Sequence, residues 1–166
     1  SRKVSVSRSF RGGLEIALLA VASVAFIIPL LWIASPLLAF ADYPLRPLPF
    51  AAGVVLLAAG LWLFHRSHAD LGTNWSITLE VRDKHRLVTE GIYHRIRHPM
   101  YLALLVYSAG QALALPNGVA GPSYGIAMTL LVAFRLGPEE RMMLATFGGE
   151  YEAYRARSWR LVPGLW

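Results

Sequence analysis

The sequence predicts an all-α, polytopic membrane protein with about four transmembrane helices and a C-terminal interfacial amphipathic helix. Its 166 residues are 55% hydrophobic and only 16% charged, whereas soluble domains carry about 25% charged residues. Three long stretches contain no charged residue, namely 16–41, 47–64 and 99–134. The charges are also distributed very unequally among the segments that separate these stretches. A soluble fold is therefore the weaker interpretation, and we expect a single membrane-embedded domain over residues 1–166.

The first two stretches predict membrane spans at residues 14–40 and 47–66. A helix needs about 20 apolar residues to cross the hydrocarbon core, which the first stretch provides and the second barely reaches. Pro29 lies inside the first stretch. Because neighbouring groups can satisfy the carbonyl that a proline frees, we expect a kink there rather than two helices. No small-residue cleavage site follows, so we expect this segment to stay in the mature protein.

The third stretch is long enough for two helices and contains turn signals near its middle. Pro116-Asn117-Gly118 and Gly121-Pro122 favour a tight connection at this point. The pattern predicts a helical hairpin with spans at residues 99–116 and 119–136. The two outer ends of such a hairpin return to the same membrane face.

Charge differs sharply between the two membrane faces that these four spans define. Arg46 is the only one of the 16 Lys and Arg residues on the far face, and all five His and nine of the ten acidic residues lie opposite. The positive-inside rule then predicts that both termini and the active site are cytoplasmic. The net charge of +6 requires no nucleic acid partner, since juxtamembrane cations attract the anionic headgroups of membrane lipids. The absence of cysteine excludes disulfides and thiolate metal sites.

A cationic cluster of Arg95, Arg97 and His98 precedes the third predicted span. Pro99 suits the first position of a helix, so the N–H groups and positive dipole end of that helix would lie beside these cations. This arrangement predicts an anion site. Alternatively, the cations anchor the helix end to phospholipid phosphate, which the spacing alone favours.

An acidic pair, Glu139 and Glu140, follows the fourth predicted span. The pattern from Gly137-Pro138 onward is typical of an amphipathic interfacial helix, in which acidic residues suit the first turn. Its apolar face consists of Leu144, Phe147, Tyr151 and Tyr154. Arg135 lies just inside the span, where an ionisable residue is costly, so it is a functional candidate with Glu139 or Glu140 as its partner. Snorkelling of Arg135 to the interface accounts for its position equally well.

A metal site is a weaker interpretation of the residues at the end of the second span. His65, His68 and Asp70 lie close together there, but no second histidine cluster accompanies them, so we predict interfacial histidines and no metal. The sequence also contains no Gly-rich nucleotide loop and no Gly-x-Ser-x-Gly nucleophile turn.

Three separated motifs give the sequence a resemblance to a known family. They are Gly91-x-Tyr93, Arg97-His98-Pro99-x-Tyr101 and Glu139-Glu140-x-x-x-Leu144-x-x-Phe147-Gly148-x-x-Tyr151-x-x-Tyr154. In order and spacing they resemble the isoprenylcysteine carboxyl methyltransferase and phospholipid methyltransferase superfamily. The resemblance begins at Leu71-Gly72-x-Asn74-Trp75-Ser76 and covers residues 71–163. It implies an integral membrane enzyme that binds S-adenosylmethionine between the third and fourth spans and the C-terminal helix.

The resemblance also implies a set of cofactor contacts. His98 and Tyr101, with the helix start at Pro99, would hold the methionyl carboxylate of S-adenosylmethionine. The other expected contacts are Leu87 and Val88, which would line the adenosine, together with Tyr93, Arg97, Glu140 and Tyr154.

The catalytic candidates implied by the resemblance are Arg135, which would position the nucleophile, and Glu140, which would bind the cofactor's amino group or orient the acceptor. A carboxylate acceptor needs little acid–base chemistry, because the sulfonium is a good leaving group and alignment supplies most of the rate. An amine or thiol acceptor would need a base, with Glu140 first and His98 second. We expect a lipophilic small-molecule or lipid-anchored substrate that offers an isoprenoid carboxylate, a lipid headgroup or a small thiol.

Two other functions are compatible with parts of the sequence. Membrane sterol and steroid reductases share an Arg-His-Pro-x-Tyr-like element, but they bind NADPH and are usually larger. The spacing from Glu139-Glu140 to Tyr154 favours the methyltransferases instead. A non-catalytic membrane adaptor could dock a partner through its interfacial helix, although this leaves Arg135 unexplained.

Overall fold

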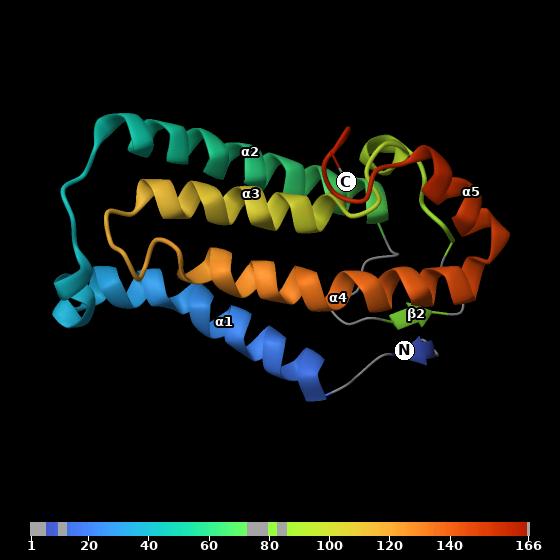
Figure 1. Cartoon of the computed structure of the whole chain (residues 1–166), viewed down its shortest axis with the longest axis horizontal. Coiled ribbons are helices and arrows are strands. Elements are labelled where there is room, and N and C mark those ends of the chain that lie inside the picture. Colours follow the sequence, from blue (N-terminus) through green and yellow to red (C-terminus); the bar gives the residue numbers. More distant parts are fainter. Residues whose placement is uncertain (1–5, 10–12, 73–79, 83–85, 166) are drawn as a thin grey trace.

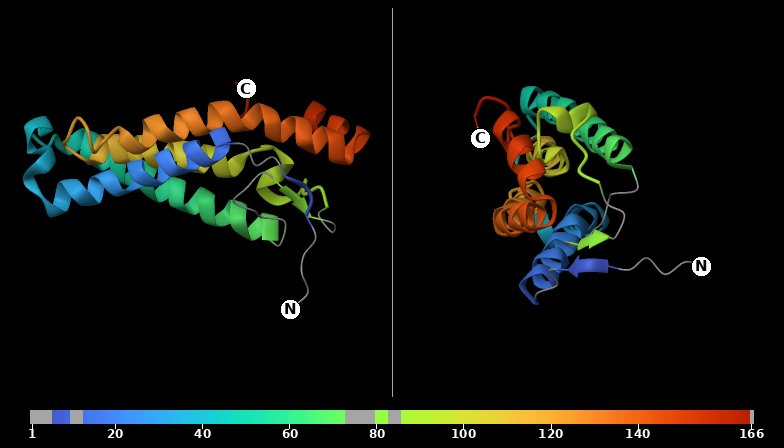
Figure 2. Two further views of the ribbon diagram at one scale, coloured as in Figure 1. Left: turned by 90° about the horizontal axis from the view of Figure 1, so that it is seen from below. Right: turned by 90° about the vertical axis from the view of Figure 1, so that its right-hand side faces the viewer.

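Four long helices dominate the computed structural model, which describes residues 6–9, 13–72, 80–82 and 86–165. Helix α2 packs along α3, α1 packs along α4, and α3 contacts α4 (Figures 1 and 2). The helices are α1 (Gly13–Ala34), α2 (Pro47–Leu71), α3 (Pro99–Ala114), α4 (Ser123–Phe147) and the shorter α5 (Gly149–Arg157), with 3-10 helices η1 (Pro36–Ala41) and η3 (Gly91–His94).

The predicted all-α fold class is confirmed, and the helices are accompanied by one short antiparallel ribbon. Strand β1 (Val6–Ser9) pairs with β2 (Glu80–Arg82), which joins the segment before α1 to the segment after α2. Strands this short carry too little alternation to be recognised from sequence. Asn74, Trp75 and Ser76, where the family resemblance begins, lie outside the described residues.

Helices α1 and α2 are each long and apolar enough to cross a membrane, and most of their side chains are exposed. Helix α1 continues through Pro29 as predicted, but it ends at Ala34, so the predicted span of 14–40 was too long. The helical path is interrupted at Ser35, whose hydroxyl accepts a hydrogen bond from the Leu37 N–H and caps η1. A serine followed by Pro36 ends one helix and begins another.

Glycines let the backbones of α2 and α3 approach closely. A Cβ at Gly60 would lie 2.7 Å from the Tyr107 backbone nitrogen, and one at Gly110 would lie 2.6 Å from that of Leu57. Gly53 faces Ala114 at a similar distance. Small residues at such an interface allow the two backbones to contact each other directly. Close packing of this kind is common between membrane helices.

Gly60→Ala is expected to lower the unfolding free energy by about 1–3 kcal/mol, because the added Cβ meets backbone that cannot move aside. Unfolding of the protein in mixed detergent micelles would measure this loss. Gly125→Ala is the matched control, since a Cβ there makes only ordinary contact with Ser108 at 3.5 Å. Equal stability of the two variants would contradict the close packing.

The connection between α3 and α4 confirms the predicted hairpin, and Asn117 fixes its tip. Asn117 is fully buried, and its Nδ2 donates to the Leu38 carbonyl at 2.7 Å and to Asp42 Oδ1 at 2.8 Å. Its Oδ1 accepts from the N–H groups of Val119 and Ala120. The hairpin tip is thereby attached to the connection between α1 and α2, at the end of the molecule opposite α5 (Figure 1).

Helix α4 runs well beyond the predicted span of 119–136 and contains Pro138, so the predicted helix from Gly137 to Tyr154 was wrong in its boundaries. A proline keeps a helical φ and costs mainly one hydrogen bond and some crowding, so a long helix can continue through it. The break comes instead at Gly148, which has a φ of 54° and donates its N–H to the Leu144 carbonyl at 2.8 Å. The C-terminal helix is the short α5, which turns back from the end of α4 (Figure 1).

Candidate active site

The segment that leads into α3 lies alongside the chain that follows α5. The Arg97 and His98 N–H groups donate to the carbonyls of Trp159 and Arg160 at 2.8 and 3.1 Å, and the Trp159 N–H donates to the Arg95 carbonyl. These bonds form a parallel bridge. The tail after α5 is therefore held against the start of α3, and Arg160 lies beside the cationic cluster.

Arg97 joins this tail to α4. Its Nε donates to Glu140 Oε1 at 3.0 Å, and its Nη1 donates to the carbonyls of Arg155 and Ser158 and to the Ser158 hydroxyl. The guanidinium is almost fully buried. Arg97 thus holds the C-terminal segment in place as well as carrying positive charge.

Glu140 lies at the centre of the site, and its side chain is only 5% exposed. Besides Arg97, its carboxylate contacts His98 Nε2 at 3.4 Å and accepts from Arg160 Nε at 3.1 Å. Burial alone would raise the pKa of Glu140, but hydrogen bonds from His98, Arg160 and Arg97 hold that pKa far below its usual range. Glu140 is therefore an ionised carboxylate surrounded by three cations.

His98 bridges the two acidic residues of α4. Its Nδ1 lies 3.7 Å from Glu139 Oε1, while Nε2 faces Glu140. Burial lowers the pKa of His98, yet its hydrogen bonds to Glu139 and Glu140 outweigh burial and raise it overall. For Glu139, burial raises the pKa of the carboxyl group. Its hydrogen bond to His98 outweighs burial, so the pKa of Glu139 is lowered overall. The two carboxylates therefore favour the protonated form of the His98 ring.

Tyr101 completes this group one turn into α3. Its hydroxyl donates to Glu139 Oε2 at 2.5 Å, and its ring stacks on His98 with centroids 5.7 Å apart. The hairpin therefore brings His98 and Tyr101 of one arm against Glu139 and Glu140 of the other. The sequence predicted that the two outer ends of the hairpin return to one face.

The ion-pair partner of Arg135 differs from the one expected. We expected Glu139 or Glu140, but Arg135 Nη2 lies 3.3 Å from Glu15 Oε1, in the first turn of α1. His98, Tyr101, Arg97 and Arg160 engage the two α4 carboxylates instead. The packing of α1 on α4 supplies this partner, which no local sequence pattern indicates.

The three buried tyrosines near the site have different surroundings. The Tyr154 hydroxyl donates to the Tyr93 carbonyl at 2.6 Å, and the Tyr93 hydroxyl donates to the Ser67 carbonyl at 3.4 Å. These two predicted cofactor contacts therefore tie α5 to η3 and α2. Tyr151 was not among the predicted site residues, although its side chain is 1% exposed and its hydroxyl has no hydrogen-bond partner among the described residues. The motif from Glu139 to Tyr154, which contains Tyr151, was the sequence feature that could have marked it as a site residue.

The remaining predicted residues lie on the approach to η3. Leu87 and Val88 are half-buried in an irregular segment. Further along, Gly91 adopts a φ of 59° and leaves room for Asp70, whose carboxylate accepts the Ile92 N–H at 2.8 Å. A side chain at Gly91 would collide with this carboxylate.

The residues considered for a metal have other contacts. Asp70 pairs with Arg66 at 3.2 Å, and His68 Nδ1 lies 3.3 Å from the Phe64 carbonyl. Within the described part of the chain, no group of three or more acidic or histidine side chains is arranged to hold a metal ion.

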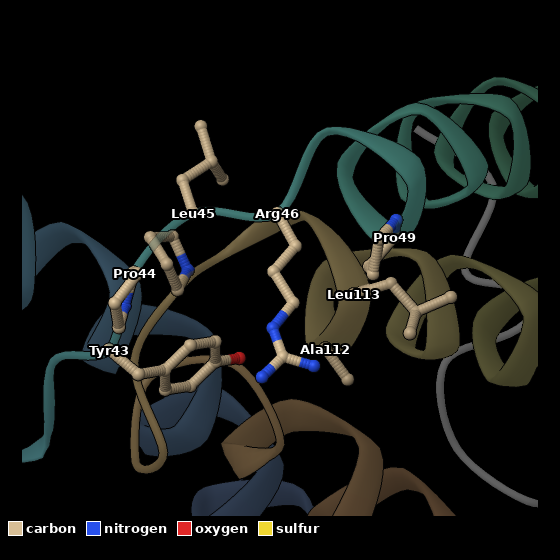
Figure 3. A pocket seen from close by; sticks show the side chains of 8 residues that line it. Tyr43, Pro44, Leu45, Arg46, Pro49, Ala112 and Leu113 are labelled. Atoms are coloured by element: carbon tan, nitrogen blue, oxygen red, sulfur yellow. The ribbon is translucent and has the colours of Figure 1, made fainter.

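A separate cavity of about 290 Å³ opens at the far end of the molecule, where α2 begins and α3 ends (Figure 3). Its lining is mostly apolar, with the Tyr43 hydroxyl and the Arg46 guanidinium as its polar groups. The Tyr43 hydroxyl donates to the Leu115 carbonyl. This cavity is remote from the charged cluster around Glu140.

Comparison with known proteins finds a matching family model and several relatives. The model of the isoprenylcysteine carboxyl methyltransferase family matches residues 51–145, more than half of the chain. Protein-S-isoprenylcysteine O-methyltransferases of Dictyostelium discoideum and Homo sapiens are 33% and 31% identical to it, over 96 and 107 residues. The alignments cover 57% and 63% of this chain but 40% and 38% of those proteins, so the chain spans less than half of their length.

The fold is also found among solved structures. One of them is that of a eukaryotic intramembrane Ras methyltransferase, ICMT (isoprenylcysteine carboxyl methyltransferase), with a TM-score of 0.63 and 24% sequence identity. The match covers 94% of this chain and 55% of that one. The shared fold includes α1, which precedes the residues matched by the family model.

Proposed function

Because the chain belongs to the isoprenylcysteine carboxyl methyltransferase family, we propose that it is an integral membrane enzyme that methylates the carboxylate of an isoprenylated cysteine. The methyl donor is S-adenosylmethionine. The relatives' names supply the acceptor class, and the charged cluster around Glu140 supplies the site.

The contacts of the two candidate bases, Glu140 and His98, are the observation that most favours a carboxylate acceptor. An amine or thiol must lose a proton, so it needs a nearby base. The Glu140 carboxylate is occupied by Arg97, His98 and Arg160, and the two ring nitrogens of His98 face the carboxylates of Glu139 and Glu140. Both groups are therefore engaged with other side chains and are poorly placed to take a proton from the acceptor. A carboxylate acceptor is already ionised and has no such requirement.

S-adenosylmethionine supplies a sulfonium methyl group, and the acceptor oxygen forms the new C–O bond while the C–S bond breaks and its electron pair stays on sulfur. No proton moves in this transfer. The protein's task is therefore to align the two reactants and to balance their charges. Arg135 is the residue that we assign to the acceptor carboxylate, since it lies one turn before the acidic pair on α4.

The residues present fit the charged groups of the cofactor. Its methionyl carboxylate suits the start of α3 at Pro99 with His98 and Tyr101, where helix dipole and cations coincide. For its ammonium group we favour Glu139 over the predicted Glu140, because Glu139 contacts fewer cations. The buried Tyr151 hydroxyl offers a further polar contact. Leu87 and Val88 are assigned to the adenosine.

Calorimetry in detergent tests the cofactor. Wild-type protein should bind S-adenosylmethionine and not NADPH, and Glu139→Gln should weaken that binding about tenfold through loss of a charged hydrogen bond. Glu150→Gln, at an exposed carboxylate of α5, is the matched control and should bind normally. Binding of NADPH in place of S-adenosylmethionine would indicate a reductase, and binding of neither would indicate an adaptor.

We also propose that α1 to α4 all cross the membrane, with both termini and the charged cluster on the cytoplasmic side. Four spans put α5 and the Glu140 cluster on one face and the Asn117 tip with Arg46 on the other. The concentration of Lys and Arg near the cluster supports a cytoplasmic position.

Cysteine labelling tests this orientation, because the chain contains no cysteine of its own. Gly118→Cys at the tip and Glu152→Cys on α5 are both exposed, and a side chain at Gly118 meets no atom closer than 3.7 Å. In sealed right-side-out vesicles, a membrane-impermeant maleimide should label Gly118→Cys alone. Inverted vesicles should give the reverse. Labelling of both variants from one side would contradict the four-span arrangement.

A further inference from the structure

The ion pair between Glu15 and Arg135 is a contact that the proposed chemistry does not yet use. Glu15 Oε1 lies 3.3 Å from Arg135 Nη2, and the two side chains are only 7% and 9% exposed. Glu15 is the only charged residue in the 22 residues of α1. It lies outside residues 51–145, so a helix beyond the matched region contributes a carboxylate to a residue within it.

Helix packing alone does not account for these two charges. Helix α1 already packs on α4 through apolar side chains, including Ala22 and Ala25 against Met128. Burying an ion pair carries a desolvation cost that its attraction often fails to exceed, so an apolar pair would hold the helices together at least as well. Stability alone therefore does not explain why these two charges are buried together.

The surroundings of Arg135 suggest a role for the pair. Glu139 and Tyr101 both lie within electrostatic range of Arg135, and Tyr101 is also within range of Glu15. The guanidinium thus contacts the carboxylate of α1 and also interacts electrostatically with Glu139 and Tyr101 of the charged cluster. A second carboxylate that reaches this guanidinium from the acceptor has to share it with Glu15 or displace Glu15.

We propose that Glu15 is a positioning residue that holds Arg135 between turnovers and competes with the acceptor carboxylate for its guanidinium. This inference rests on the proposed function, in which Arg135 binds that carboxylate. Methylation converts the acceptor carboxylate to a neutral ester, which no longer competes. Glu15 then regains Arg135 as the product leaves.

Glu15→Gln is the decisive variant, because glutamine preserves the shape and an acceptor oxygen while removing the charge. The measurements are kcat and the KM of an S-isoprenylated cysteine derivative with a free carboxylate, and the inhibition constant of its methyl ester. We expect the KM for the carboxylate to fall about fivefold or more, because the competing charge is gone. The inhibition constant of the ester and the dissociation constant of S-adenosylmethionine should be unchanged.

Two further variants separate positioning from stability. Glu15→Asp keeps the charge but shortens the side chain, so its KM should fall between those of wild type and Glu15→Gln. If Glu15→Gln fails to bind S-adenosylmethionine, we take that variant to be misfolded. The KM of Glu15→Asp then tests the role of Glu15 in its place. Glu152→Gln makes the same chemical change at an exposed site on α5 and should alter nothing.

The outcomes distinguish this inference from the proposed function. An unchanged KM in a folded Glu15 variant, or an equal change for carboxylate and ester, would overturn the role of Glu15 while leaving the enzyme activity intact. Wild-type protein that methylates no carboxylate would overturn the proposed function, and this inference with it.

Discussion

Glu140→Ala is expected to lower the unfolding free energy by about 3–5 kcal/mol, because three cations lose the carboxylate that they share. Arg97 and His98 are buried, so neither can regain full hydration. Arg97 also holds the tail after α5, and we expect this tail to detach first. Unfolding in mixed micelles measures the free energy, and limited proteolysis reports the release of the tail.

Two controls accompany this prediction. Glu140→Gln keeps the shape of the side chain and some of its hydrogen bonds, so its loss should be smaller. Glu150→Ala removes an exposed carboxylate and should cost less than about 1 kcal/mol. If Glu140→Ala cost no more than Glu150→Ala, the cluster would not be the stabilising centre that its contacts indicate.

Arg135→Ala is expected to reduce kcat/KM for the acceptor about 100-fold, while the affinity for S-adenosylmethionine persists. The reason is that the acceptor carboxylate loses the group that aligns it, and misalignment is costly in a reaction that depends on geometry. The kcat/KM of Arg135→Lys should lie between those of wild type and Arg135→Ala. An ammonium group keeps the charge but cannot bind a carboxylate in a bidentate manner. Initial rates at varied acceptor concentration, together with calorimetry for the cofactor, measure both effects.

Arg141→Ala is the matched control for Arg135, because Arg141 lies on the same helix but is exposed. Its activity should equal that of wild type. A loss of S-adenosylmethionine binding in Arg135→Ala would instead assign Arg135 to the cofactor.

The starts of α2 and α3 were predictable because a proline marks each one. Pro47 and Pro99 stand at the first helical positions, as the sequence indicated. The ends were harder. Ser35 stops α1 inside an uninterrupted apolar run, and α4 continues through Pro138 because one lost hydrogen bond does not end a long helix. Gly148 was the better signal for the end of α4, because its φ of 54° is a conformation that favours glycine.

The meeting of His98 with Glu139 and Glu140 could be predicted because a hairpin returns its two ends to one place. The ion pairs that Glu15 and Arg160 form with Arg135 and Glu140 could not be predicted. Glu15 and Arg160 come from segments outside the hairpin, and only the packing of α1 and the docking of the tail bring them in. Tertiary contacts of this kind leave no periodic pattern in the sequence.

Transfer of a labelled methyl group is the most direct test of the proposed activity. Wild-type protein in detergent would be incubated with methyl-labelled S-adenosylmethionine and an S-isoprenylated cysteine derivative, offered either with a free carboxylate or with that carboxylate amidated. We predict label on the free carboxylate only, as an ester that mild base releases as methanol. Label that resists base, equal labelling of the amide, or no label on either compound would contradict carboxylate methylation.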